Sequence, residues 1–122
     1  MEILVFGSNL AGIHGAGSAK LACEQYGAEW GIGEGRTGNA YAIPTKGTSL
    51  HRSRELNAIK ESAQEFIRYA ESNPDCTFKV VKVGCGLAGY TEAQIAPMFK
   101  DAPANCNLPD GWRVPPAESG EQ

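Results

Sequence analysis

The sequence predicts an α/β protein in which helices flank a mixed, mainly parallel sheet in three layers. Two observations support this prediction. Apolar strand-like runs alternate with amphipathic helix-like stretches, and glycine-rich turns follow two of the runs. Such alternation is typical of layered folds in which helices connect parallel strands. The 122 residues are enough for one domain but not for two cores. We expect that domain over residues 1–113.

The first predicted unit is a strand, a loop and a helix. Ile3-Leu4-Val5-Phe6 is a continuous apolar run, which indicates a strand covered on both faces. A helical apolar stripe follows from about residue 17 to residue 26, and Gly27 stands where a helix commonly ends. We expect a glycine loop over residues 30–39.

The middle of the chain predicts a strand, a long helix and another strand. In the strand-like run 41–46, Pro44 marks an edge or a strand end. Apolar residues then recur at three- and four-residue steps from about residue 53 to residue 71, which predicts an amphipathic helix. The β-branched run 77–83 leads directly into the second glycine turn.

The last predicted elements are short. Thr91 and Gln94 fit a capping box at the start of a helix. Pro97 lies within that helix, which predicts that the helix is kinked or short. Residues 106–108 predict a brief final strand. Residues 114–122 have the proline, glycine and charge content of a flexible, solvated tail, so we exclude them from the fold.

Composition narrows the function classes. The net charge is −3 at pH 7 and no basic block is present, which disfavours a polyanion as the main partner. The four cysteines lack zinc-ligand spacing, which favours reduced thiols in a cytoplasmic protein. No stretch approaches the roughly 20 apolar residues of a membrane span. We expect no membrane partner, no metal and no cofactor.

Two glycine-rich turns predict the functional site. Gly15-Ala16-Gly17 and Gly84-Cys85-Gly86-Leu87-Ala88-Gly89 each lie between a strand-like and a helix-like run. Glycine lets a ligand approach the main chain, and a helix N-terminus offers unpaired N–H groups and partial positive charge. Because parallel strands end at one sheet edge, we expect both turns to face one anion pocket, suited to a nucleotide diphosphate.

Other glycine-rich motifs fit less well. Residues 33–38 match G-x-G-x-x-G, but no strand-like run precedes them and no helix follows. Residues 84–89 also match it, and Asp110 lies near the distance that a Rossmann-like dinucleotide site requires. Too little chain remains for the second half of a Rossmann sheet, so this stays a less favoured alternative. The first loop lacks the ending of a P-loop, which disfavours NTP hydrolysis.

The motifs resemble the two ligand loops of macrodomains, which are ADP-ribose-binding α/β modules. The resemblance rests on Phe6-Gly7-Ser8-Asn9, on residues 15–19 and on residues 83–90, and it spans about residues 3–109. The sequence is most similar to the branch that contains terminal ADP-ribose protein glycohydrolase, whose loops read G-A-G-x-A and G-C-G-L. The resemblance implies a compact macrodomain-like fold that binds ADP-ribose or a related NAD-derived nucleotide.

The resemblance also implies site residues. Asn9 would face the distal ribose, and Lys46 falls where the glycohydrolase branch keeps a lysine that attacks the anomeric carbon. An amine attacks only when it is unprotonated, so this chemistry needs a desolvated lysine. The early aspartate that usually holds adenine has no counterpart, so adenine would be held differently. The residues that would wrap the phosphates are Gly15, Ala16, Gly17, Ser18, Gly84, Cys85, Gly86, Leu87, Ala88, Gly89 and Tyr90.

One departure from the branch leaves several functions open. The branch keeps an aspartate, acting as acid and base, where this chain has Ala88. Losing a proton-transfer partner typically costs about 10²–10⁴-fold in rate, so Glu34, Glu92 or Asp101 would have to replace it. The hypotheses are ADP-ribose binding, hydrolysis of ADP-ribosyl linkages on protein or nucleic acid through Lys46, and non-catalytic sequestration of a nucleotide signal.

Three other kinds of side chain lie near the loops. A surface position for His14 is at least as consistent with the sequence as a ligand contact. Cys85 lies beside a helix N-terminus, where thiol pKa values fall, although a tight loop alone also explains a small residue there. Tyr90 follows the second loop and is a better candidate to stack on adenine than Trp30 or Trp112.

Overall fold

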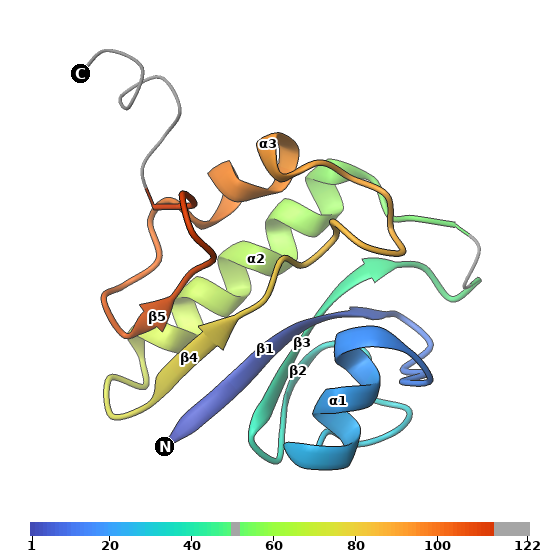
Figure 1. The fold of residues 1–122 in the computed structure, drawn as a ribbon, viewed down its shortest axis with the longest axis horizontal. Helices are drawn as coiled ribbons and strands as arrows, with labels where there is room; N and C mark the ends of the chain where they lie inside the picture. The colour runs from blue at the N-terminus through green and yellow to red at the C-terminus, as the bar shows by residue number, and fades with distance from the viewer. Residues whose placement is uncertain (50–51, 114–122) are drawn as a thin grey trace.

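Five strands form one mixed sheet in the order β2-β3-β1-β4-β5 (Figure 1). The structure is a computed structural model, and it describes residues 1–49 and 52–113. Neighbouring strands run parallel except β2, which pairs antiparallel with β3. The predicted α/β class and mainly parallel sheet are therefore confirmed. The strands are β1 (Glu2–Asn9), β2 (Gly35–Thr37), β3 (Ala40–Lys46), β4 (Thr77–Val80) and β5 (Cys106–Asn107).

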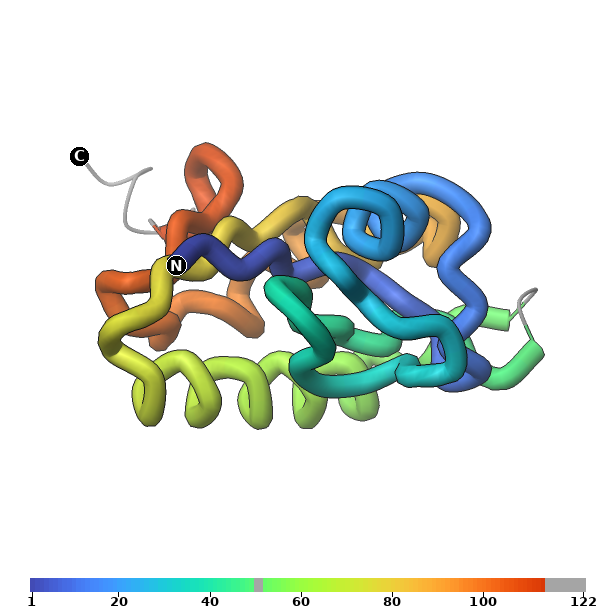
Figure 2. Tube along the Cα trace, turned by 90° about the horizontal axis from the view of Figure 1, so that it is seen from below, coloured from blue at the N-terminus to red at the C-terminus, as the bar shows by residue number. Residues whose placement is uncertain are grey.

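Helices cover both faces of the sheet. Figure 2 shows α1 (Gly17–Gln25) and α2 (Leu56–Glu71) on opposite sides of it. Alternate residues of β1 explain this: Leu4 and Phe6 pack in a cluster with α1, whereas Ile3 and Val5 pack in a cluster with α2. The helix α3 (Glu92–Ile95) and the 3₁₀ helix η1 (Ala96–Phe99) contribute to the α2 cluster. The predicted three-layer fold is confirmed.

The α2 side holds the larger core. Phe66 of α2 is fully buried, and its ring lies 5.1 Å from that of Tyr41, 5.4 Å from that of Phe78 and 6.3 Å from that of Phe99. The first two contacts are edge-to-face, a geometry that stabilises aromatic pairs beyond the burial of apolar area. This cluster holds α2 against β3 and against β4, the strand that precedes the second glycine loop.

Several local predictions are confirmed. Gly27 has a left-handed φ of +77° just after α1, and Thr91 and Gln94 form the capping box of α3. Pro97 lies in η1, so the α-helical part ends early, as predicted. Pro44 lies near the end of β3, beyond the residues that pair with β2. The predicted tail at 114–122 lies outside the described residues.

Other local predictions were wrong. Part of the expected loop at 30–39 forms β2, a strand too short to show periodicity. The strand expected over 77–83 ends at Val80. The helix expected from about residue 53 to residue 71 is present and ends at Glu71, but it begins at Leu56. Within residues 1–49 and 52–113, no helix is long and apolar enough to cross a membrane.

Candidate functional site

The two glycine loops lie together at the carboxyl ends of the parallel strands. The first loop leaves β1 after Asn9, and the second loop follows β4. In the sheet, β1 lies between β3 and β4. A Cβ added to Gly7 would lie 3.5 Å from the backbone N of Gly84, so the end of β1 directly abuts the second loop. The sheet topology therefore brings together segments about 70 residues apart in sequence.

Two hollows are formed where these loops meet. The loop hollow, of about 200 Å³, is lined by residues 16–19 of the first loop and α1, and by residues 82–84 and 86–88 of the second loop, with Gly7 between them. The lysine hollow, of about 300 Å³, is lined by Asn9, Gly15 and Lys46 among others. Both hollows share Gly7, Ala16, Ala19 and Leu87 in their walls.

Most of the predicted site residues line one of these hollows. The exceptions are Cys85, Gly89 and Tyr90. Leu87 lines both hollows and is 77% exposed, so it forms an apolar rim between them. The structure thus brings Asn9 and Lys46 next to both glycine loops.

Backbone N–H groups without partners lie on both sides of the loop hollow. Gly17, Ser18 and Ala19 form the first turn of α1, where Ala16 provides no side-chain cap and no acidic residue is present. Their N–H groups, like those of residues 86–88, donate to no residue in the part of the chain that the structure describes. Such clustered amides, with the partial positive charge of a helix N-terminus, suit an anion.

The second loop is held in shape by a hydrogen bond within the loop and by two hydrogen bonds to residues just before α2. The Tyr90 N–H donates to the Gly84 carbonyl (2.9 Å), and Gly84 has a left-handed φ of +77° that favours glycine. The Ser53 hydroxyl donates to the Ala88 carbonyl (2.6 Å). The Tyr90 hydroxyl donates to the Arg54 carbonyl (2.5 Å), and the tyrosine packs against the α2 core cluster. Tyr90 therefore fixes the end of the second loop to the segment before α2 and to the α2 core cluster.

The buried His14 supports the first loop. It is 1% exposed, and its Nε2 lies 3.0 Å from the Glu29 carbonyl and 3.2 Å from the Ile32 carbonyl, so Nε2–H is the donor. Its Nδ1 has no partner among the described residues. A surface position for His14, which the sequence allowed, is therefore wrong. Its ring packs edge-to-face on Phe6, a contact that sequence periodicity does not reveal.

Among residues 1–49 and 52–113, the charged residues that line the two hollows are both lysines. Lys46 lines the lysine hollow, and Lys82 lines the loop hollow. The sequence analysis did not single out Lys82, although its position just before the second glycine loop was a usable signal. No Asp, Glu or His lines either hollow in the described part of the chain.

The three acids proposed to replace the missing aspartate lie elsewhere. Glu34 and Asp101 line two separate hollows. Glu92 accepts hydrogen bonds from the Trp112 indole N–H (3.0 Å) and from the Lys82 ammonium (3.1 Å), and these bonds lower the pKa of its carboxyl. A carboxylate stabilised in its ionised form is a poor general acid. Trp112 itself is 3% exposed in the core.

Cys85 does not have the features of a reactive thiol. Burial raises the pKa of its thiol, and the nearby Glu92 carboxylate raises it further. The pKa decrease expected beside a helix N-terminus is therefore not found. The thiol lies 3.5 Å from the Val83 carbonyl and packs against the α2 core cluster. A small, partly buried side chain at this position is consistent with a tight loop.

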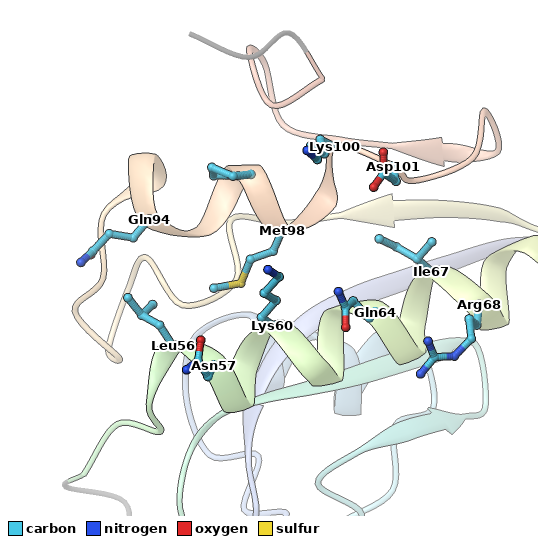
Figure 3. A pocket seen from close by; sticks show the side chains of 11 residues that line it. Leu56, Asn57, Lys60, Gln64, Ile67, Arg68, Gln94, Met98, Lys100 and Asp101 are labelled. Carbon is cyan, nitrogen blue, oxygen red and sulfur yellow. The ribbon is translucent and has the colours of Figure 1, made fainter. Parts of the chain in front are cut away.

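A wider groove lies between α2 and η1, apart from the glycine loops (Figure 3). It has a volume of about 620 Å³, and Lys60, Met98, Lys100 and Asp101 are among its lining residues. Apart from Asp101, one of the three candidate acids, it contains none of the residues that the sequence analysis placed in the ligand site. Volume alone therefore does not identify this groove as the functional site.

Comparison with known proteins identifies the fold. No protein-family model and no curated protein matches this sequence. A Bacteroides thetaiotaomicron protein of unknown function superposes with a TM-score of 0.61 at 13% identity, over 83% of this chain and 79% of that one. Thermosipho africanus DarTG, solved in complex with ADP-ribose, superposes with a TM-score of 0.58 at 17% identity, over 88% of this chain and 39% of that one.

These likenesses define the class of the protein by its architecture. The chain has a macrodomain-like α/β fold, with a mixed sheet and two glycine loops at one sheet edge. This chain spans well under half of the DarTG chain, and at 17% identity the likeness extends to the fold alone.

Proposed function

We propose that this protein binds ADP-ribose or a closely related NAD-derived nucleotide, with the diphosphate held between its two glycine loops. The observation that supports this most directly is the set of N–H groups at residues 17–19 and 86–88, which line one hollow and have no partner among the described residues. Backbone amides bind a dianion without net positive charge on the protein. The fold shared with DarTG, solved with ADP-ribose, favours this ligand among nucleotide diphosphates.

The arrangement of the hollows fits an elongated ligand. Sites for small molecules usually measure about 300–1,000 Å³, and each hollow alone is at or below the lower end of that range. Because Gly7, Ala16 and Leu87 line both, one ligand can extend from one into the other. The diphosphate would occupy the loop hollow, and a ribose would occupy the lysine hollow beside Asn9 and Lys46.

We propose further that the protein holds its ligand without turning it over. Proton transfer needs a group within hydrogen-bond reach of the reacting atoms. Among the described residues, neither hollow is lined by an Asp, Glu or His, and Ala88 occupies the position where the resembled branch keeps its acid. A module that reads or sequesters an ADP-ribose signal is consistent with this set of side chains.

Hydrolysis of an ADP-ribosyl linkage is the second candidate. The position of Lys46 favours it, since this amine lines the same hollow as Asn9 and Gly15. The substrate would be an ADP-ribosylated protein or nucleic acid. Release of ADP-ribose from such a substrate, lost in Lys46→Ala, would support the enzyme. Release that survives Lys46→Ala would exclude the lysine mechanism.

A thermal-shift panel tests the binding proposal. ADP-ribose, cyclic ADP-ribose, ADP, NAD and adenosine are added separately, and a ligand at 100 times its Kd stabilises the fold by about 2.7 kcal/mol. We expect the largest increase in melting temperature with ADP-ribose and none with adenosine, which has no diphosphate. An unchanged melting temperature with every nucleotide would contradict the proposal.

A further inference from the structure

Among the described residues that line the loop hollow, Lys82 is the charged one. It lies two residues after the end of β4 and lines the hollow together with Gly17, Gly84 and Gly86. Its side chain is 55% exposed, and its ammonium lies 3.1 Å from one carboxylate oxygen of Glu92. The ammonium thus has an anionic partner within the protein while its residue lines a hollow rich in free backbone N–H groups.

Glu92 is held more firmly than Lys82. Its second carboxylate oxygen accepts the Trp112 indole N–H at 3.0 Å, and Trp112 is 3% exposed, with its ring 5.6 Å from that of Phe99. Glu92 also begins α3, directly after the capping residue Thr91. A lysine, in contrast, has a flexible four-carbon stem. If the pair separates, the lysine is the side chain that moves.

The energetics of the two possible partners differ. An exposed ion pair such as Lys82 with Glu92 contributes little stability, because water solvates both charges well. A charge-assisted hydrogen bond to phosphate is stronger, above all when neighbouring N–H groups also bind that phosphate. A diphosphate in the loop hollow would therefore attract the Lys82 ammonium away from Glu92 at small cost.

We propose, on the basis of the function proposed above, that Lys82 binds the diphosphate directly and that Glu92 is a resident anion competing for its ammonium. Ligand binding exchanges one ion pair for another, with no covalent step. The exchange makes affinity depend on ligand charge, so the site selects diphosphates over monophosphates and neutral sugars. Glu92 sets the affinity by holding Lys82 when the site is empty.

Calorimetric titration with ADP-ribose and with inorganic pyrophosphate tests this exchange. Lys82→Gln should weaken both ligands about 10-fold, in line with the loss of one charge-assisted hydrogen bond. Glu92→Gln should tighten both by about 3-fold, the scale of an exposed ion pair. Its amide oxygen can still accept the Trp112 N–H. The double variant should bind like Lys82→Gln, because Glu92 acts only through Lys82.

A matched control separates this effect from net charge. Lys79→Gln removes the same charge from an exposed position on β4 that lines neither hollow, and it should leave both affinities unchanged. Wild-type affinity in Lys82→Gln, or an equal effect of Glu92→Gln with and without Lys82, would overturn the exchange. If the wild-type protein binds neither ligand, the proposed function itself fails and the exchange fails with it.

Discussion

The side-chain amide of Asn9 and the backbone of Ile13 are joined by two hydrogen bonds. The Asn9 Nδ2 donates to the Ile13 carbonyl at 2.8 Å, and the Ile13 N–H donates to Asn9 Oδ1 at 3.0 Å. The pair closes the start of the first glycine loop where it leaves β1. One Nδ2 hydrogen and one Oδ1 lone pair remain, so Asn9 can shape the loop and still contact a ribose.

Asn9→Ala should destabilise the protein and weaken ligand binding. Asn9 is 8% exposed, and its loss leaves the Ile13 N–H and carbonyl without these partners, which costs about 1–3 kcal/mol. Urea unfolding monitors the stability, and calorimetry with ADP-ribose monitors binding. Unchanged values in both measurements would show that the two hydrogen bonds do not organise the loop.

Gly86→Leu should block binding without unfolding the protein. Gly86 is exposed, its φ is outside the left-handed region, and a Cβ there would meet nothing within 4 Å. A leucine therefore extends into open space beside the loop hollow. We expect at least a 10-fold loss of ADP-ribose affinity, a smaller loss in Gly86→Ala, and a change in unfolding free energy within about 0.5 kcal/mol. Equal affinity in all three proteins would remove the second loop from the site.

Ala88→Asp restores an acid at the position where the resembled branch keeps its aspartate, and it tests whether the lack of that acid prevents hydrolysis. If the missing acid is the cause, the variant should release ADP-ribose from a modified protein at least 10-fold faster than wild type, within the range typical of proton-transfer groups. The added charge lies beside the loop hollow, so binding should weaken at the same time. Combining the change with Lys46→Ala should abolish release. Hydrolysis by the wild-type protein at the variant's rate would contradict non-catalytic binding.

Phe66→Ala should cost about 3–5 kcal/mol of unfolding free energy, because it opens a cavity among the rings of Tyr41, Phe78 and Phe99. Urea unfolding measures the loss. Leu87→Ala is the matched control, since Leu87 is 77% exposed and its truncation should change stability by less than about 0.5 kcal/mol. Equal losses in both variants would contradict the assignment of the core to the α2 side.

Cys106 should resist alkylation in the folded protein. It is 1% exposed, and burial raises the pKa of its thiol to about 11. Only the thiolate reacts, so at pH 8 about one Cys106 in a thousand is in the reactive form. Mass spectrometry after iodoacetamide treatment at pH 8 should find Cys106 unmodified until denaturant is added. Rapid labelling of the native protein would place this thiol outside the core.

Much of the fold could be predicted because the decisive patterns are local. The apolar run Ile3-Leu4-Val5-Phe6 lies within β1, and the apolar residues that recur every three or four positions lie on α2. The Thr91 capping box also forms as expected. In contrast, β2 exists only because three residues pair with β3, and Trp112 is buried only because η1 brings Phe99 to it. Such contacts between distant segments leave no periodic signal in the sequence.

The meeting of the two loops that form the candidate site was predictable to a similar extent. The glycine loops were found because their spacing after each strand is itself a local pattern, and parallel pairing then predicted that they would meet. Lys82 was missed although it precedes the second glycine loop, because its pairing with Glu92 and its place in the wall of the loop hollow are not visible in the sequence. His14 was misjudged for the same reason, since carbonyls of a later loop bury it.

Amide chemical shifts test the central claim most directly, because that claim concerns backbone N–H groups. In a titration of the isotope-labelled protein with ADP-ribose, we predict that the amide signals of residues 17–19 and 86–88 move together with one dissociation constant. Amides beside the α2–η1 groove, such as those of Lys60 and Met98, should stay in place. Movement of only one loop, or of the groove instead, would contradict a shared diphosphate site.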